Sequence, residues 1–212
     1  MPSATDVRRP PLPTAAASRR VRLLGAGLVT GSVVGLLASV VLTVEKARLA
    51  ADPAYVPSCS VNPVLSCGSV MASDQASLLG FPNSVLGLVG FPVVLVAGLL
   101  LVARAGLPAR AWPVLQLGLL GGVVFVHWLA FQTLYRIGAL CPYCLAVWAV
   151  TVPMAWYVTV HRWRARSEAG HVLARPAAVA VSLHGVLITA WFVGIAALIA
   201  QRFWSYWSSL LP

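Results

Sequence analysis

The run VLGLVGFPVVLVAGLLLVA, residues 85–103, contains no Asp, Glu, Lys or Arg. A helix needs about 20 apolar residues to cross the hydrocarbon core of a bilayer, so this run is long enough to span it. Of the 212 residues, 59% are hydrophobic and only 9% are charged, against about 25% charged residues in a typical soluble domain. Four further stretches have the same character: residues 23–44, 114–135, 141–160 and 178–201. The sequence therefore predicts an all-α membrane protein with five transmembrane helices.

The net charge of +10 indicates orientation in a membrane rather than nucleic-acid binding. The basic residues lie beside the apolar spans and form no stripe with interleaved aromatics, so nucleic acid is not an expected partner. With the N-terminus in the cytoplasm, the inner side holds eleven arginines: Arg8, Arg9, Arg19, Arg20, Arg22, Arg104, Arg110, Arg162, Arg164, Arg166 and Arg175. The outer side holds four basic residues: Lys46, Arg48, Arg136 and Arg202. This bias predicts a multi-pass plasma-membrane protein with a cytoplasmic N-terminus and an outer C-terminus.

The chain divides into a tail, a membrane domain and a short end segment. Residues 1–20, rich in Pro, Ala, Ser and Arg, predict a disordered cytosolic tail. Residues 21–201 form the five-helix domain, with an outer segment at 45–84, and the aromatic residues of 202–212 predict an outer interfacial tail. Cleavage of the first span as a signal peptide is the alternative, although its apolar region exceeds the usual 7–15 residues. Gly27, Gly31 and Gly35 predict close helix packing, within one bundle or in a homodimer.

All four cysteines lie on the predicted outer side, in two pairs. Cys59 and Cys67 are separated by seven residues in the outer segment, whereas Cys141 and Cys144 form CPYC at the start of the fourth span. Pro142 suits a first helical turn, where unpaired amides stabilise a thiolate. Two pairs on one face predict thiol–disulfide exchange. A structural disulfide and a zinc half-site are the alternatives, and zinc would need two more ligands.

The first pair lies beside a segment that predicts a short surface helix. From Val70 to Leu79, apolar and polar residues alternate as in a helix lying on a membrane. We expect a mobile, exposed cysteine loop, with Cys67 tethered near Cys141 and Cys59 free to reach a partner. A static loop closed by a disulfide is the alternative.

Three motifs in this order resemble the vitamin K epoxide reductase (VKOR) family, in its bacterial branch. They are CSVNPVLSCGSVMAS at 59–73, FPNSVLG at 81–87 and CPYC at 141–144. The resemblance covers about residues 20–201 and implies a four-helix bundle around a quinone, plus a fifth transmembrane helix. It also implies that Cys144 meets the quinone, that Cys141 exchanges with Cys67, and that Cys59 exchanges with a thioredoxin-fold protein.

Four other residues are candidates for the quinone end of the site. The resemblance gives Ser73 an auxiliary role and places the Asn83 side chain on a quinone carbonyl; a surface serine and a helix N-cap are their alternatives. Trp148 stands where the animal enzymes of the family have a tyrosine, so reduction of an epoxide substrate is in doubt. We expect Asn83, Trp148 and Phe131 to line an apolar pocket beside Cys144.

These observations predict a membrane thiol–disulfide oxidoreductase. It would oxidise an extracytoplasmic thioredoxin-fold protein, pass the electrons through both cysteine pairs to a membrane quinone, and so support disulfide bond formation. Many bacterial relatives carry a fused thioredoxin-like domain after the fifth helix; this chain ends at Pro212, so a separate partner is expected.

The cofactor expected from the resemblance is a quinone, with neither metal nor flavin. Fourteen Arg against one Lys, with abundant Ala, is typical of a GC-rich genome, and by that association menaquinone is favoured over ubiquinone. An unrelated four-helix quinone-linked oxidase places its CxxC in the first outer segment, the reverse of the order here. A membrane scaffold or transporter held by disulfides, without redox activity, is the alternative of a different class.

Overall fold

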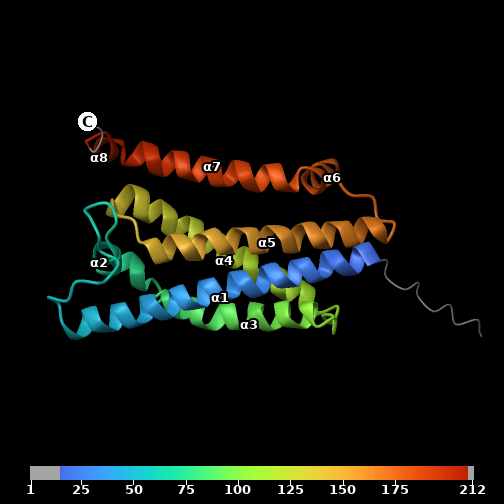
Figure 1. Cartoon of the computed structure of the whole chain (residues 1–212), viewed down its shortest axis with the longest axis horizontal. Helices are drawn as coiled ribbons and strands as arrows, with labels where there is room; N and C mark the ends of the chain where they lie inside the picture. Colours follow the sequence, from blue (N-terminus) through green and yellow to red (C-terminus); the bar gives the residue numbers. More distant parts are fainter. Residues whose placement is uncertain (1–14, 210–212) are drawn as a thin grey trace, which may run out of the picture.

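The computed structural model describes residues 15–209, and this part of the chain is helical with no β-strand. Its short elements are α2 (Cys67–Met71), η1 (Asp74–Ser77), α6 (Arg175–Ser182) and α8 (Trp204–Ser208). Five helices are long and apolar enough to cross a membrane (Figure 1): α1 (Ala15–Ala51), α3 (Ser84–Val102), α4 (Ala111–Gln132) with its π-helical extension η2 (Thr133–Ile137), α5 (Pro142–Glu168) and α7 (His184–Arg202). The predicted all-α membrane fold is confirmed.

Helices α1, α3, α4 and α5 form the four-helix bundle, and α7 lies on its outside. Helix α1 packs along α3 and against α5, while α4 packs on α5. These contacts bury Leu28, Leu101 and Val158 almost completely. Helix α7 joins the bundle by one face, on which Trp191 contacts the cluster around Trp148, and none of its residues is buried. The other faces of α7 are therefore left for lipid.

Helix α1 is longer at both ends than the predicted span of residues 23–44. It begins at Ala15, inside the predicted tail of residues 1–20, of which residues 1–14 lie outside the described structure. It ends at Ala51, inside the predicted outer segment. Charged residues such as Arg20 and Lys46 interrupt the apolar run, but Arg and Lys are good helix formers. The helix therefore continues beyond the apolar core.

The single surface helix predicted for residues 70–79 is wrong. The segment forms α2 followed by the 3-10 turn η1. Ser73 lies between them, and its Oγ donates to the carbonyl of Val70 at 2.7 Å, a local bond that competes with helix continuation. Helix α2 begins earlier than predicted because Ser66 is its N-cap, with a side chain that accepts from the Ser69 amide.

The fifth predicted span, residues 178–201, is divided in the structure. Helices α6 and α7 are separate, and α7 begins at His184. Two side chains of α5 bond to this junction: Trp156 Nε1 donates to the His184 carbonyl at 3.0 Å, and Arg164 Nη2 donates to the Val181 carbonyl at 3.4 Å. The fifth crossing is therefore the shorter α7, with α6 leading into it.

Glycines of α1 allow close contact with its neighbours. A Cβ on Gly35 would overlap the Phe91 ring, and one on Gly31 would lie 2.8 Å from the Met154 sulfur. Gly27 differs, because no neighbouring atom lies within 4 Å of its Cβ position. Gly31 and Gly35 thus pack within the bundle, as one of the two sequence interpretations expected.

We predict that Gly35→Ala lowers the stability of the bundle while Gly27→Ala does not. Overpacking against the rigid Phe91 ring should cost about 1–3 kcal/mol, more than the gain from replacing a helical glycine. Thermal unfolding of both purified variants in the same detergent measures the difference. Equal melting temperatures for Gly35→Ala and the unsubstituted protein would show that α1 and α3 separate easily.

Candidate active site

A short parallel β-bridge between Leu65 and Leu140 brings the two cysteine pairs together. The Leu140 amide donates to the Val64 carbonyl at 2.7 Å, and the Ser66 amide donates to the Leu140 carbonyl at 2.9 Å. Each bridge residue precedes a cysteine: Cys67 begins α2 two residues after Leu65, and Cys141 directly follows Leu140. The backbone register therefore sets which sulfurs meet.

The chain reaches the second pair through a turn that needs glycine. The π-helical η2 ends at Gly138, whose φ of 72° lies in the left-handed region that glycine adopts without strain. Cys141 then takes the extended N-cap conformation of α5, and Pro142 follows within the first turn. This is the helix start that the CPYC motif predicted.

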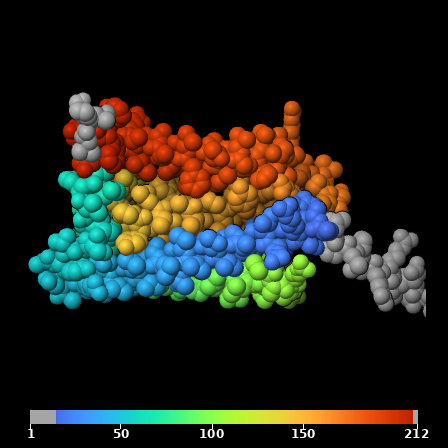
Figure 2. All heavy atoms as spheres, viewed as in Figure 1, coloured from blue at the N-terminus to red at the C-terminus, as the bar shows by residue number. Residues whose placement is uncertain are grey.

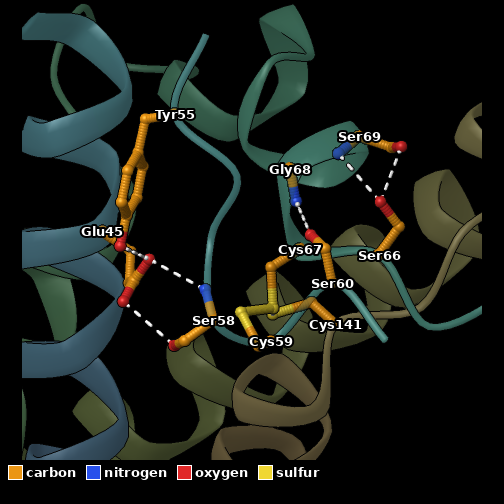
Figure 3. Close-up of a disulfide and its surroundings, with 10 residues drawn as sticks. All are labelled: Glu45, Tyr55, Ser58, Cys59, Ser60, Ser66, Cys67, Gly68, Ser69 and Cys141. Atoms are coloured by element: carbon orange, nitrogen blue, oxygen red, sulfur yellow. Dashed lines mark hydrogen bonds between the residues drawn. A yellow bond between two sulfur atoms is a disulfide. The ribbon is translucent and has the colours of Figure 1, made fainter. Parts of the chain in front are cut away.

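Three sulfurs lie together at this point (Figure 3). Cys59 and Cys67 form a disulfide, while Cys141 and Cys144 are free. Cys141 Sγ lies 3.2 Å from Cys67 Sγ, and the sulfurs of Cys59, Cys67 and Cys141 all lie within 4.8 Å of one another. A Cys141 thiolate is thus within reach of Cys67 for thiol–disulfide exchange.

The surroundings of Cys141 favour its thiolate. The Cys144 thiol donates a hydrogen bond to the Cys141 sulfur and lowers the pKa of Cys141, an effect that burial opposes and that the backbone amides of Cys144 and Tyr143 reinforce. These amides belong to the first turn of α5, where helix N–H groups have no helical partner. The backbone amides at this N-terminus thus lower the pKa of Cys141 in the expected direction, but the Cys144 thiol has the larger effect.

The first pair is buried, contrary to the expectation of a mobile, exposed loop. Cys59 is 6% exposed and Cys67 is 0% exposed. They pack against Val70, Met71 and Ala139 in a small apolar cluster. The sequence could not show this, because burial comes from contacts with α1 and with the segment before α5. Cys59 Sγ is therefore inaccessible from outside the molecule unless this segment opens locally.

Glu45 of α1 anchors the segment before Cys59, and sequence reasoning missed it. Its carboxylate accepts three hydrogen bonds: from the Tyr55 hydroxyl at 2.9 Å, the Ser58 hydroxyl at 3.0 Å and the Ser58 amide at 3.3 Å (Figure 3). Glu45 is only 5% exposed. An acidic residue near the C-terminal end of an apolar helix was the one available signal, because a buried charge needs such partners.

An apolar cavity of about 950 Å³ adjoins the second pair. It lies among α1, α3, α4 and α5, and its walls are mainly Val, Leu and Gly side chains of α3 and α4. Cys141, Cys144, Asn83 and Trp148 all line it. A largely apolar cavity with a few polar groups is typical of a small-molecule site.

The structure brings Asn83 to the cavity but holds its amide in the loop. Asn83 Nδ2 donates to the Gln75 carbonyl at 2.6 Å, and Oδ1 accepts from the Leu78 amide at 3.2 Å. Asn83 occupies the N-cap position of α3, as the alternative expected, but its side chain makes no capping bond there. One N–H of its amide has no bond within the described chain. Ser73 bonds to Val70 and does not line the cavity.

Trp148 is buried at the cavity, whereas Phe131 is exposed. Trp148 is 6% exposed, lines the cavity, and has a buried Nε1 without a hydrogen-bond partner among residues 15–209. Phe131 is 51% exposed, contacts the Tyr135 ring, and does not line the cavity. The expectation that Phe131 faces the pocket is therefore not met. Helix α4 is apolar on all sides, so its sequence gave no indication of the inward face.

The three-sulfur group also has the spacing of a metal site, but its chemistry differs. Metals bind cysteine as thiolate, and Cys59 and Cys67 share their sulfurs in a disulfide. The arrangement instead supports exchange between a disulfide and the adjacent Cys141 thiol.

A comparison with protein families matches residues 27–159 to the vitamin K epoxide reductase family. The match covers more than half of the chain, from α1 into α5, and includes both cysteine pairs. The chain belongs to this family. VKOR-family proteins are membrane disulfide oxidoreductases that work with a quinone and a thioredoxin-like partner. No curated protein matches the sequence. The cavity beside Cys144 is largely apolar and contains the Trp148 donor, which has no partner among residues 15–209, so its chemistry is compatible with a quinone.

We predict that Glu45→Gln speeds reduction of the Cys59–Cys67 disulfide of this VKOR-family protein by a water-soluble phosphine. The glutamine NH2 cannot accept from Ser58 or Tyr55. Hydrogen bonds to a charged group contribute about 1.5–3 kcal/mol, so local opening should become about 10- to 100-fold more frequent. Quenched thiol counting gives the rate, with Glu168→Gln, which breaks only an exposed ion pair with Arg20, as control. An unchanged rate would show that Glu45 does not restrain the loop.

Proposed function

We propose that this protein oxidises an extracytoplasmic thioredoxin-fold protein and passes the electrons to a membrane quinone, so supporting disulfide bond formation. The observation that carries this proposal is the 3.2 Å separation of Cys67 Sγ and Cys141 Sγ, combined with the position of Cys144 on the cavity. A disulfide that only held a loop in place would need no second pair within exchange distance. The alternative of a scaffold without redox activity is therefore disfavoured.

The first exchange is with the partner protein. A partner thiolate attacks Cys59 Sγ, and the Cys59–Cys67 bond breaks with Cys67 leaving as a thiolate. The second partner thiol then attacks the mixed disulfide and releases oxidised partner and reduced Cys59. Two electrons have passed to the Cys59 and Cys67 pair. Opening of the segment held by Glu45 precedes this step, because Cys59 is buried in the closed arrangement.

The second exchange is internal. When Cys141 and Cys144 form a disulfide, the Cys67 thiolate attacks Cys141, and Cys144 leaves as a thiolate. Cys59 then attacks Cys67, which restores the first disulfide and releases Cys141. The described state, with Cys59–Cys67 joined and Cys141 and Cys144 free, is the product of this exchange.

Cys144 delivers the electrons at the cavity. When Cys141 and Cys144 return to their disulfide they release two electrons and two protons, which a quinone held in this cavity would accept. We assign its polar contacts to the free amide N–H of Asn83 and to Trp148 Nε1, which lies buried without an acceptor in the described chain. Menaquinone is the proposed species, on the composition of the sequence alone.

The charge distribution supports one orientation. Both cysteine pairs lie at one end of the bundle, and arginines of α1 and α5 gather at the other. We infer that the arginine end faces the cytoplasm of a plasma membrane and that the cysteine end faces outward. That side is oxidising, as stable disulfides require.

We predict that Cys144→Ala accumulates a Cys67–Cys141 disulfide. Cys141 can still attack Cys67 and displace Cys59, but Cys144 is no longer present to resolve the product. Acid quenching, alkylation of free thiols and non-reducing peptide mapping of membranes would identify the linkage. Cys141→Ala is the control and should contain no linkage between the pairs. A dominant Cys59–Cys141 disulfide would reverse the roles of the two loop cysteines.

We also predict that Trp148→Phe raises KM for a short-chain naphthoquinone about 3- to 10-fold, with kcat for a reduced thioredoxin-fold substrate nearly unchanged. Loss of one hydrogen bond of about 0.5–1.5 kcal/mol gives this range. The control is Trp163→Phe, because Trp163 belongs to the same helix but does not line the cavity. Equal KM values for all three proteins would remove Trp148 from the quinone site.

A further inference from the structure

A second cavity of about 760 Å³ lies at the end of the bundle opposite the cysteines. Its walls come from the first half of α1 and the second half of α5, with His184 at the start of α7. On the face shown in Figure 2, α5 lies between α1 and α7. Apolar residues form its floor, among them Leu24, Leu28, Val150 and Met154. None of these residues belongs to the cysteine site.

Cationic and polar side chains surround one end of this cavity. Arg20, Arg164, His161 and His184 line it, and Glu168 is its one carboxylate. Glu168 pairs with Arg20 at 3.4 Å, both side chains being about half exposed or more. Positive charge therefore exceeds negative charge at this end.

Arg164 has no acidic partner in the described chain. Its Nη2 lies 3.4 Å from the Val181 carbonyl and 3.2 Å from His184 Nδ1, and no carboxylate lies within ion-pair distance of it among residues 15–209. The Arg164 side chain is half-buried beside the C-terminal end of α6. A guanidinium held in this way has donors left for an anion, and phosphate oxygens match its geometry.

We propose that this cavity binds one acidic phospholipid from the leaflet opposite the cysteines. The phosphate bonds to Arg164, and an acyl chain lies along the apolar floor between α1 and α5. Basic pockets between transmembrane helices are suited to acidic lipid headgroups. A zwitterionic lipid fits less well, because its ammonium group would add a cation beside Arg164, Arg20 and the two histidines.

The position of α7 supports this occupant. Helix α7 contacts α5 without burying any residue of its own, and His184 is the one residue of α7 that lines the cavity, so α7 leaves most of it uncovered. A Cβ on Gly27 would meet no atom within 4 Å, and Gly27 lines the cavity. That open space beside α1 is where the acyl chain lies. The proposal is independent of the redox relay and of which side the cysteines face.

The test compares lipid binding by delipidated protein and two variants that remove different parts of the site. Arg164→Gln removes the charge, and Gly27→Leu fills the floor without touching the charge. Their controls are Arg166→Gln on the same helix and Gly194→Leu on α7, neither of which lines the cavity. Phosphatidylglycerol and phosphatidylcholine with identical acyl chains are titrated, and native mass spectrometry counts the adducts.

We expect one phosphatidylglycerol adduct on the unsubstituted protein and on both controls, with affinity about 10-fold higher than for phosphatidylcholine. Arg164→Gln and Gly27→Leu should each lose this preference. Melting temperatures without lipid show that the variants are folded, and phosphatidylglycerol should raise them only where the site is intact. Equal binding of both lipids, or unchanged binding by Arg164→Gln, would overturn the proposal. A dimer that both variants abolish would instead identify the cavity as an interface between two copies.

Discussion

The backbone pairing of Leu65 with Leu140 is the contact on which the active site depends. Two hydrogen bonds join a loop to a segment more than 70 residues later, and the side-chain period of extended backbone fixes which residues follow. Cys67 and Cys141 come directly after the bridge, each at the start of a helix. A slip of one residue in this pairing would separate the sulfurs, because helix α5 cannot shift within the bundle to compensate.

The bridge also keeps the sulfurs that take part in thiol–disulfide exchange away from water. It holds the Cys59–Cys67 disulfide in an apolar cluster beneath a segment anchored by Glu45. A buried disulfide exchanges readily with the adjacent Cys141 but slowly with thiols in solution, since access limits the rate. The anchor is three hydrogen bonds from two residues, few enough to open locally without unfolding the bundle.

The sequence predicted those features that arise from local composition and motif. The five spans follow from apolar runs, and the helix start at Cys141 follows from Pro142. The bridge and the Glu45 anchor could not be predicted, because both join segments distant in sequence. Phe131 was placed wrongly for another reason: in a membrane helix, lipid-facing and core-facing residues are equally apolar, so periodicity does not reveal the inward side. Asn83 reached the cavity as expected, but its bonds to Gln75 and Leu78 depend on how the loop folds.

Helix α7 lies beyond the residues that match the family, yet it supports both parts of the site. Trp191 Nε1 donates to His127 Nε2 at 3.1 Å, and the rings of both residues contact Trp148 edge-on. The wall of the cavity is thereby held from outside the four-helix bundle. At the other end of α7, Phe203 packs with Val64 and Leu140 of the bridge region. Helix α7 therefore packs against both the cavity wall at Trp148 and the bridge region beside the cysteines. Weakening the packing of α7 on the bundle would disturb both regions. The region that matches the family holds the four cysteines and lines the cavity, while the fifth helix packs beside both from outside the bundle.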